Sequence, residues 1–483
     1  MTEFLKKCCI HIPQRFIMCG LIFAVYAVCI MDRQAYFQAV RTMVYIATPA
    51  EESKSKCPAM IERRHIDAEE TKSRFYWDRR VKRAVTQAFY VGFLVSNIPA
   101  GCVADHYGGR GLMIVGVLVG SLTTLSLPSL AIRGPTPLLL ARLVQGVGQG
   151  LVFSSTHSLI AQWAPTSERS RFVGISHSGT GLGWGMGHVL HHVFRDRWQM
   201  PFYLIGVMGL LWVLVFYLLS SSNPIQSVYI QDTELQYILN NREGLVVQTL
   251  RVRHHIPWKA VFKSLPVWSL LFINWAFNWT HYTMNNQFRY YIISVLRITE
   301  DLSQSSTFGE SVVLPTSIVF WSIVSDYLVN HEYMSRTFHR KLFGFTCNAL
   351  MIICLLIIPS AGCSGLTVFS THVILCYLRG IYYSAMYANP IDLSPRHAGL
   401  LMALLNSTGS VAGLFSREIV SVIDTPSDIS QWWLVYLWLI ALLAVFSPPY
   451  LCFGSAEVQS WNTPVRRTMR SIMPSPASHG SDM

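Results

Sequence analysis

Three polar side chains occur within ARLVQGVGQG (141–150), a stretch inside an otherwise apolar run: Arg142, Gln145 and Gln149. On a helix that turns about 100° per residue they fall within about 60° of one another and form one polar stripe. An arginine inside a membrane costs at least about 2.5 kcal/mol unless it faces a cavity or a partner. Arg142 is therefore predicted to bind a negative charge. The glutamines could instead bond between helices that pack closely at Gly146 and Gly150.

A second polar stripe is predicted further along the chain. Asn274, Asn278, His281, Asn285 and Arg289 fall within about 80° of one another on a helix. This pattern predicts a wall of an aqueous cavity that faces Arg142. Two alternatives remain open: the asparagines could bond to neighbouring helices, and Arg289 could extend to the membrane surface.

Several single residues are further candidates. His157 lies about 60° from Arg142 on the same helix and could sense pH, although a buried, hydrogen-bonded histidine fits the same pattern. Arg33 could bind substrate or extend to the interface. Asn389 begins the segment NPID at a helix corner. The histidines of GHVLHHV (187–193) lack carboxylate or thiolate neighbours, so no metal site is predicted there.

The elements that position these residues are long apolar segments. Apolar residues make up 51% of the chain and charged residues only 13%, where a soluble domain has about 25% charged residues. A bilayer-crossing helix needs about 20 mainly apolar residues. The apolar runs are 16–31 (continuing to about 40), 84–104, 111–132, 137–163, 171–194, 199–221, 265–296, 306–329, 342–361, 366–390, 398–422 and 431–454. The sequence predicts an all-α membrane protein with twelve transmembrane helices.

Polar segments divide the chain. We predict an N-terminal bundle at 1–221 with a long outer loop at 41–83, a cytoplasmic linker at 222–263 with an amphipathic helix near 230–242, a C-terminal bundle at 264–456, and a disordered cytoplasmic tail at 457–483. The net charge of +12 comes mainly from loop residues. Basic loop residues favour the cytoplasmic side of a membrane, so both termini are predicted to be cytoplasmic. Because membrane topology explains the positive charge, no nucleic-acid partner is predicted. Cys57 and Cys363 fall in predicted outer loops, so a disulfide between them is possible.

One short pattern recurs in both halves. GCVADHYGGR (101–110) follows the second span and WSIVSDYLVNHEYMSR (321–336) follows the eighth, and each has an aspartate at the cytoplasmic helix end. Asp105 is predicted to accept hydrogen bonds from the N-terminus of a neighbouring helix, with Asp326 in the matching place. Such a contact holds in only one of two arrangements of the halves. The gating residues predicted from this pattern are Gly101, Asp105, Gly109, Arg110 and Asp326.

The same loop pattern resembles the signature of the major facilitator superfamily. Further stretches resemble the anion:cation symporters, the family of sialin, the vesicular glutamate transporters and the type I sodium–phosphate cotransporters. They are QWAPTSERSRFVGISHSGTGLG (162–183), IPWKAVFKSLPVW (256–268), NWTHYT (278–283), NPIDLSPRHAGLLMALLNSTGSVAGL (389–414) and FGSAEVQSW (453–461). The resemblance implies the major facilitator fold: two pseudosymmetric six-helix bundles around a midplane site.

The resemblance also implies a function. It predicts a secondary active or facilitative transporter of a small anion: a carboxylate, a sialic acid-like, glutamate-like or urate molecule, or phosphate. Sodium ion and a proton are the candidate coupling ions. The membrane would be the plasma membrane or a lysosomal or vesicular one. The alternative is a receptor on the same fold that has lost its coupling residues. No enzymatic constellation or cofactor is expected.

Departures from the family bear on this function. Arg142 matches a family arginine implicated in anion binding. Gln149 stands where sialin-like members have a proton-coupling glutamate, Cys29 stands at a family arginine, and Pro390 replaces a histidine. Because glutamine cannot titrate, we predict weak proton coupling unless His157 or His281 supplies it. Voltage would then drive the anion.

Overall fold

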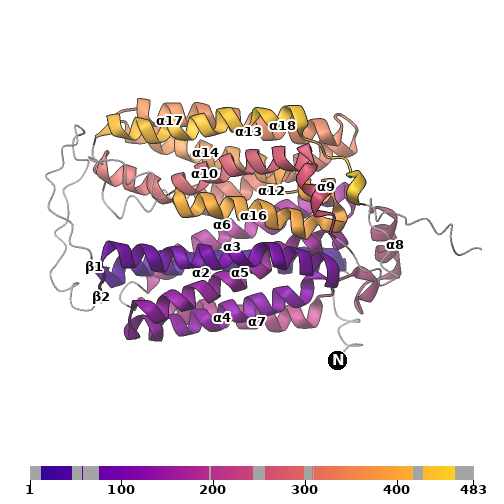
Figure 1. The fold of residues 1–483 in the computed structure, drawn as a ribbon, viewed down its shortest axis with the longest axis horizontal. Helices are drawn as coiled ribbons and strands as arrows, with labels where there is room; N and C mark the ends of the chain where they lie inside the picture. Colours follow the sequence, from indigo (N-terminus) through magenta and orange to yellow (C-terminus); the bar gives the residue numbers. More distant parts are fainter. Residues whose placement is uncertain are drawn as a thin grey trace, which may run out of the picture.

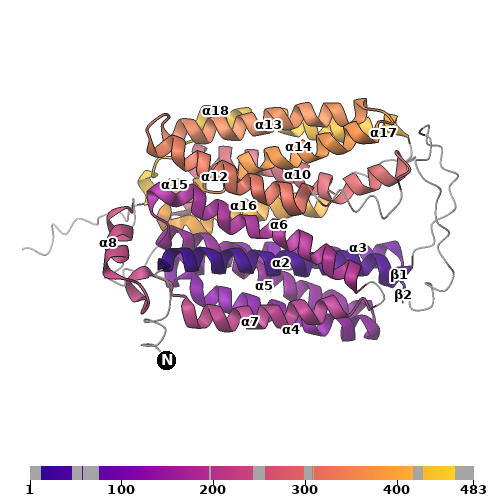
Figure 2. The same cartoon turned by 180° about the vertical axis from the view of Figure 1, so that it is seen from behind.

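The computed structural model describes residues 12–45, 57, 75–194, 197–242, 256–298, 307, 309–416 and 428–462. Long helices run side by side in two groups, one from each half of the chain (Figures 1 and 2). Two short strands lie at one end of the helices, and α8 lies at the other. We call these the β1–β2 end and the α8 end.

The N-terminal bundle contains six long helices. They are α2 (Gln14–Met43), α3 (Arg79–Tyr107), α4 (Gly109–Arg133), α5 (Pro135–Trp163), α6 (Arg169–Val193) and α7 (Met200–Leu219). Glycines allow the helices of this bundle to pack most closely. A Cβ at Gly146 of α5 would lie 2.0 Å from the Phe89 carbonyl oxygen of α3, so these two backbones can touch only because no side chain intervenes.

The C-terminal bundle repeats this arrangement. It contains α10 (Leu265–Ser294), the π-helical turn η5 (Gly309–Val313) with α12 (Leu314–Asn330), α13 (Arg336–Ser360), α14 (Gly365–Met386), α16 (Ala398–Phe415), and α17 (Ile429–Phe446) with α18 (Pro448–Phe453). The short helix α15 (Asn389–Leu393) and the 3-10 turn η6 (Pro395–His397) connect α14 to α16.

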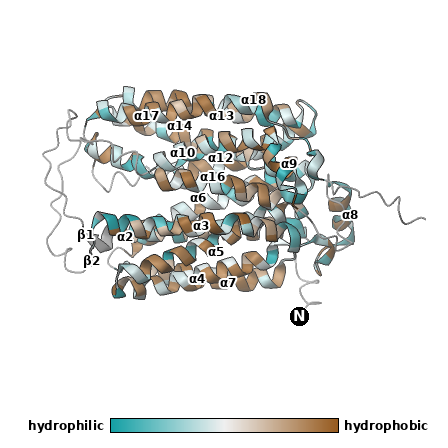
Figure 3. Cartoon of the chain, viewed as in Figure 1, coloured by the Kyte–Doolittle hydropathy of each residue, from teal (hydrophilic) through white to brown (hydrophobic). Residues whose placement is uncertain are grey.

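These twelve helical segments match the twelve apolar runs of the sequence. Among the described residues, nine helices are long and apolar enough to cross a membrane. The remaining three, α6, α10 and α14, are long enough but more polar, because they carry glycine, serine, histidine and asparagine along their faces. Brown, apolar residues are frequent along the long helices in Figure 3. The fold is that of a polytopic membrane protein with two six-helix bundles.

The linker has ordered helices at the α8 end. It contains η3 (Pro224–Gln226), α8 (Asp232–Asn240) and α9 (Trp258–Lys263), so the helix predicted near 230–242 is present. Glu234 of α8 accepts hydrogen bonds from the backbone N–H groups of Gln14 and Arg15, 2.8 and 3.0 Å away. These N–H groups have no partner within α2, so α8 caps the first helix.

Two details differ from the sequence prediction. Two-residue strands, β1 (Val44–Tyr45) and β2 (Phe75–Tyr76), pair in parallel within the predicted outer loop. The tail, predicted to be disordered from residue 457, is instead ordered as far as Asn462. There η8 (Ser460–Asn462) packs on η6, and Ser394 donates to Asn462 Oδ1 over 2.7 Å. The rest of the predicted tail, 463–483, lies outside the described residues.

The possible disulfide is present. Cys57 bonds to Cys363, which joins the loop between α2 and α3 to the loop between α13 and α14 at the β1–β2 end. The two halves of the chain are therefore covalently linked at this end.

Candidate functional site

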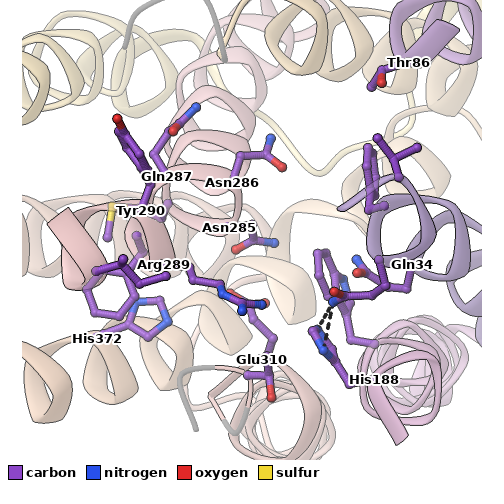
Figure 4. A pocket seen from close by; sticks show the side chains of 18 of the residues that line it. Gln34, Thr86, His188, Asn285, Asn286, Gln287, Arg289, Tyr290, Glu310 and His372 are labelled. Atoms are coloured by element: carbon purple, nitrogen blue, oxygen red, sulfur yellow. Dashed lines mark hydrogen bonds between the residues drawn. The ribbon is translucent and has the colours of Figure 1, made fainter. Parts of the chain in front are cut away.

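Two cavities lie between the bundles. The central cavity has a volume of about 100 Å³ and is lined by α2, α3, α5 and α6 from one half and by α10, α12, α14 and α16 from the other. The vestibule, about 400 Å³, is lined by the helix ends that adjoin β1 and β2 (Figure 4). Residues common to both linings are Gln34, Phe37, Trp184, Asn285 and Asn286. The two cavities therefore form one space that widens toward the β1–β2 end.

Arg33 is the only residue with a formal charge that lines the central cavity within the described part of the chain. Its Nε donates to Gln149 Oε1 over 2.7 Å. Its guanidinium lies 4.8 to 4.9 Å from the ring centroids of Phe89, Phe93 and Phe153. Its buried Nη2 has no hydrogen-bond partner. Aromatic faces and one amide thus hold a cation whose free donor is available to an anion.

The polar stripe of α10 also reaches the cavity. Asn278, His281 and Asn285 line it together with Arg33, whereas Arg142, which this stripe was expected to face, does not. Arg379 of α14 donates to His281 Nδ1 over 2.6 Å and to Asn285 Oδ1 over 3.0 Å. These two side chains are therefore oriented by a buried cation behind them. Asn274, at the other end of the stripe, bonds to α16 instead, with 2.9 Å to the Leu405 carbonyl.

Arg142, the predicted anion anchor, does not line either cavity, and this expectation needs correction. Its side chain is fully buried in the N-terminal bundle, with the guanidinium 3.8 Å from the Tyr36 ring centroid. Helical phase predicts which residues of α5 share one face, but it does not predict which neighbouring helix that face packs against. The stripe faces α2 and α4 of the same bundle, because Gly146 packs α5 against α3 on the other side.

The partner of this stripe is Asp32 of α2, which sequence reasoning missed. Its two carboxylate oxygens accept from Gln145 Nε2 at 2.6 and 2.7 Å, and Oδ2 accepts from Gln149 Nε2 at 2.8 Å. Thr124 of α4 donates to Oδ1 over 2.7 Å. Arg142 in turn donates to Gln145 Oε1. The signal in the sequence was the acidic residue of MDRQ (31–34) within an apolar span.

A symmetric relay results. Each glutamine accepts from one arginine and donates to the same carboxylate, in the order Arg33–Gln149–Asp32–Gln145–Arg142. With Asp32 ionised, the relay carries one excess positive charge. The prediction of weak proton coupling assumed that no carboxylate stands beside these glutamines. That assumption is wrong, because the acid lies on α2 rather than α5.

Two other predicted binding residues lie outside the cavity linings. His157 is fully buried, and its Nε2 contacts the Tyr387 carbonyl of the other bundle at 3.0 Å. Its neighbour His177 of α6, not singled out from the sequence, lines the central cavity instead. Asn389 is buried in α15 and donates to the Tyr450 hydroxyl, so it supports the corner rather than the cavity.

A buried ion pair in the C-terminal bundle was also missed. Arg379 of α14 pairs with Glu310 of the π-helical turn η5. Arg379 Nη2 also lies 3.0 Å from Cys376 Sγ. Glu310 and His372 line the vestibule (Figure 4). An acid and an arginine inside two predicted spans were visible in the sequence, but nothing in it related the eighth span to the tenth.

The α8 end is closed by matching contacts between the bundles. Asp105 of α3 accepts from the N–H groups of Gly399 and Leu400 at the start of α16, at 2.9 and 2.8 Å. Asp326 of α12 accepts from Ser170 and Arg171 at the start of α6, at 3.0 and 2.8 Å. Each aspartate therefore caps a helix of the other half, as the repeated pattern predicted for Asp105.

A buried charge cluster reinforces this closure. Asp392 of α15 accepts from Arg169 Nη1 of α6 at 2.6 Å and from Arg340 Nε of α13 at 2.9 Å. Burial raises the pKa of Asp392, but the charges of Arg340 and Arg169 outweigh it and hold the pKa below its usual range. The carboxylate therefore stays ionised and connects both bundles.

The remaining gate residues have distinct contacts. A Cβ at Gly101 would lie 2.5 Å from the Gly399 carbonyl oxygen of the other bundle, and one at Gly109 would lie 2.5 Å from the Ser155 carbonyl oxygen of α5. Arg110 does not cross between bundles. Its Nη2 donates to the Tyr217 carbonyl of α7 over 2.6 Å, because the turn at Gly108 (φ 93°) directs α4 alongside α7.

This architecture can be compared with known proteins. The family model described as Major Facilitator Superfamily matches residues 16–416. The chain belongs to the major facilitator superfamily. Human sialin is 26% identical over 431 residues, with 88% of this chain and 86% of sialin covered. Human vesicular glutamate transporter 2 is 25% identical over 401 residues, with 81% of this chain and 68% of that transporter covered.

Solved structures of the superfamily share the fold. The proton:xylose symporter XylE superposes with a TM-score of 0.67 at 12% identity, covering 92% of this chain and 97% of XylE. The transporter FucP in its outward conformation gives a TM-score of 0.59 at 12% identity, with 90% of this chain and 99% of FucP covered. As a member of this superfamily, the protein is a multi-pass membrane transporter of small solutes.

Proposed function

We propose that the protein transports a small organic anion by alternating access, with Arg33 as the electrostatic anchor. The observation that carries this proposal is the free Nη2 of Arg33 at the wall of the central cavity. An unpaired buried donor costs about 1 to 3 kcal/mol. An anionic oxygen would satisfy it. Asn278, His281 and Asn285 offer further polar contacts from the opposite bundle.

The cavity favours a substrate with one negative charge and an apolar or planar body. Among the described residues that line it, only Arg33 carries a formal charge, and much of the remaining wall is aromatic. The aromatic residues are Phe37, Tyr90, Phe93, Phe153, Trp184, Tyr282, Tyr383 and Tyr387. An organic carboxylate or a urate-like anion suits this wall better than phosphate, whose polar surface would leave the rings without a partner.

Alternating access would proceed by rocking of the two halves, residues 1–221 and 264–456, joined by the linker at 222–263. We assign the described conformation to the state open at the β1–β2 end. The Asp105 and Asp326 caps and the Asp392 cluster support this assignment, because all three connect the bundles at the α8 end. Gly101 would permit closure, while Gly109 and Arg110 hold the turn between α3 and α4.

Coupling of the anion to a cation would depend on Asp32. A proton on this carboxylate removes the negative charge next to the anchor and increases the excess positive charge of the relay. Anion binding and protonation would then favour each other by the same free energy. A sodium ion at the carboxylate would act in the same direction. The proposal therefore differs from the sequence prediction, in which Arg142 was the anion anchor and only His157 or His281 could supply proton coupling.

We place the α8 end, the linker and both termini in the cytoplasm. The basic side chains of Arg15, Arg110 and Arg171 at this end support that orientation. The Cys57–Cys363 bridge at the opposite end supports it independently, because disulfides persist in oxidising compartments. We propose the plasma membrane or a lysosomal or vesicular membrane as its location, and the similarity to a vesicular glutamate transporter supports the vesicular choice.

Uptake into proteoliposomes across a panel of anions, under imposed pH, sodium and voltage gradients, tests the proposal. Arg33→Gln should weaken substrate affinity by about 2 to 5 kcal/mol, or roughly 30-fold to several thousand-fold. Arg142→Gln removes an equal charge from the far end of the relay, outside the cavity. It should lower the amount of folded protein and raise KM by about tenfold or less, well below the effect of Arg33→Gln. Unchanged affinity in Arg33→Gln would reject the anchor. A chain that binds an anion but transports none of the panel would favour the receptor alternative.

A further inference from the structure

Three metal-ligating side chains lie together beside the vestibule. Glu310 of η5 and His372 and Cys376 of α14 are all buried, and their ligand atoms lie within 4.8 Å of one another. Cys376 Sγ is 3.6 Å from Glu310 Oε1 and 3.7 Å from His372 Nε2. His372 and Cys376 are four residues apart on one helix, so both side chains project from the same face.

These separations suit a tetrahedral ion. Zinc lies about 2.3 Å from thiolate sulfur and about 2.0 to 2.2 Å from imidazole nitrogen or carboxylate oxygen. Ligand atoms at tetrahedral angles are then about 3.4 to 3.6 Å apart. The two sulfur distances fall close to this range without movement of the backbone. One nitrogen, one sulfur and one oxygen ligand also form a set that zinc accepts.

An unsatisfied acceptor points to a missing ligand. Glu310 is 5% exposed, and its Oε2 has no hydrogen-bond partner. The ring of His372 is held against Phe288, with ring centroids 3.7 Å apart and planes nearly parallel, so its orientation is fixed. A buried carboxylate oxygen without a partner is costly, and a cation bound there would remove that cost.

Two cations could oppose an ion. Arg379 donates to both Glu310 and Cys376, and Arg289 lines the vestibule together with Glu310 and His372. Arg379 contacts Glu310 through Oε1, the same oxygen that lies 3.6 Å from Cys376 Sγ. An ion bound by Oε1 therefore shares this oxygen with Arg379, while Oε2 stays available as a second ligand atom of the carboxylate. The bond from Arg379 to Cys376 Sγ is of the kind that metal-bound thiolates accept from neighbouring N–H groups. With Glu310 and the thiolate both negative, a divalent ion brings the cluster, with Arg379, to one net positive charge. Arg379 can therefore remain as an outer partner.

Access is provided by the vestibule. Glu310 and His372 line it, so an ion can enter from the β1–β2 end and keep one coordination position for water (Figure 4). The proton released from the Cys376 thiol leaves by the same route.

We propose that Glu310, His372 and Cys376 form a binding site for zinc. The site lies within one bundle, so it does not lock the rocking motion. Its ligands are the partners of Arg379, and Arg379 orients His281 and Asn285 at the cavity wall. An ion bound there therefore shares the ligands that hold Arg379 and, through Arg379, tunes substrate affinity. The site itself does not depend on the proposed transport function.

The test uses the purified full-length protein with cobalt(II) as a spectroscopic probe for zinc. The background variant is Cys452→Ser, which removes an exposed thiol. Stoichiometric cobalt should give a thiolate charge-transfer band that zinc displaces. Cys376→Ser should abolish the band. His372→Gln should weaken cobalt affinity by more than the about 10- to 100-fold expected for loss of an outer partner. Cys354→Ser, a buried cysteine of α13, is the matched control and should leave the band intact.

Several outcomes would overturn the proposal. No charge-transfer band in the background variant, with the protein monodisperse and thermally stable, means that Arg379 alone fills the cluster. A band that survives in folded Cys376→Ser places the metal at another cysteine. Because the readout is spectroscopic, inactive transport would not affect either conclusion, and a failed metal test would leave the anion transport proposal standing.

Discussion

Replacing Asp32 with asparagine removes one negative charge from the middle of the relay and keeps the side chain's size. In the structure this carboxylate accepts hydrogen bonds from Gln145, Gln149 and Thr124. The charges that face it are Arg142 of α5 and Arg33 of its own helix. The titratable side chains nearby are Cys29 and Tyr36, also on α2. The substitution therefore tests the electrostatic influence of one group on the anion at Arg33.

The size of the effect follows from the contacts. One amide, that of Gln149, separates Arg33 Nε from Asp32 Oδ2, with bonds of 2.7 and 2.8 Å on its two sides. An anion on the outer side of Arg33 would then lie about 10 to 11 Å from Asp32, and two unit charges at that distance interact by about 1.5 kcal/mol at an effective dielectric constant of about 20. Removing this repulsion should tighten anion binding about tenfold.

The assay is initial-rate uptake into proteoliposomes at neutral and at mildly acid pH. In the unmodified protein KM should fall as the pH falls, because protonation removes the same repulsion. Asp32→Asn should have a KM about tenfold lower at neutral pH and should lose that part of the pH response, leaving only contributions from His177 and His281.

Thr124→Val is the matched control. It deletes one hydrogen bond to Asp32 without changing charge, so it should reduce stability by about 0.5 to 3 kcal/mol and leave KM unchanged. If Asp32→Asn reaches the membrane but keeps the original KM and pH response, the relay does not couple charge to substrate, and the reasoning is refuted.

Three further predictions concern the two ends of the molecule. Asp105→Asn should weaken the cap on α16 by about 1.5 to 3 kcal/mol. The rate at which a thiol reagent added at the α8 end labels Met402→Cys should then rise roughly 10- to 150-fold. Asp78→Asn, at an exposed position, should leave this rate unchanged. Asp392 has a lowered pKa, so its stabilisation is complete above the ordinary value of about 3.9 and is lost only as pH falls through the lower one. The contribution of this cluster to thermal stability should therefore be the same at neutral and at lysosomal pH. A smaller contribution at lysosomal pH would contradict the lowered pKa of Asp392. Replacing Cys57 and Cys363 by serine should cost about 2 to 4 kcal/mol in the unfolding free energy, and equal stability with a Cys354→Ser control would show that the bridge constrains nothing.

The twelve helices followed from apolar runs, because the bilayer imposes a length and a polarity on every span. The α10 stripe also followed, since helical phase decides which residues share a face. The location of Arg142 could not be predicted in this way, because helical phase does not show which neighbouring helix a face packs against. Asp32 and Glu310 were each a single acid in an apolar run, and their importance came from partners more than 60 positions away in the sequence.

The close approach of glycines between the bundles has a consequence for inherited substitutions. At Gly101 an added methyl would meet the backbone of Gly399, and at Gly174 it would meet the Ser322 side chain of α12, with Oγ at 1.8 Å. Neither change affects packing inside a single bundle. A carrier of such a missense variant would make a protein that folds, reaches its membrane and stains normally, yet cannot close one end. Tests of protein abundance would score these variants as benign.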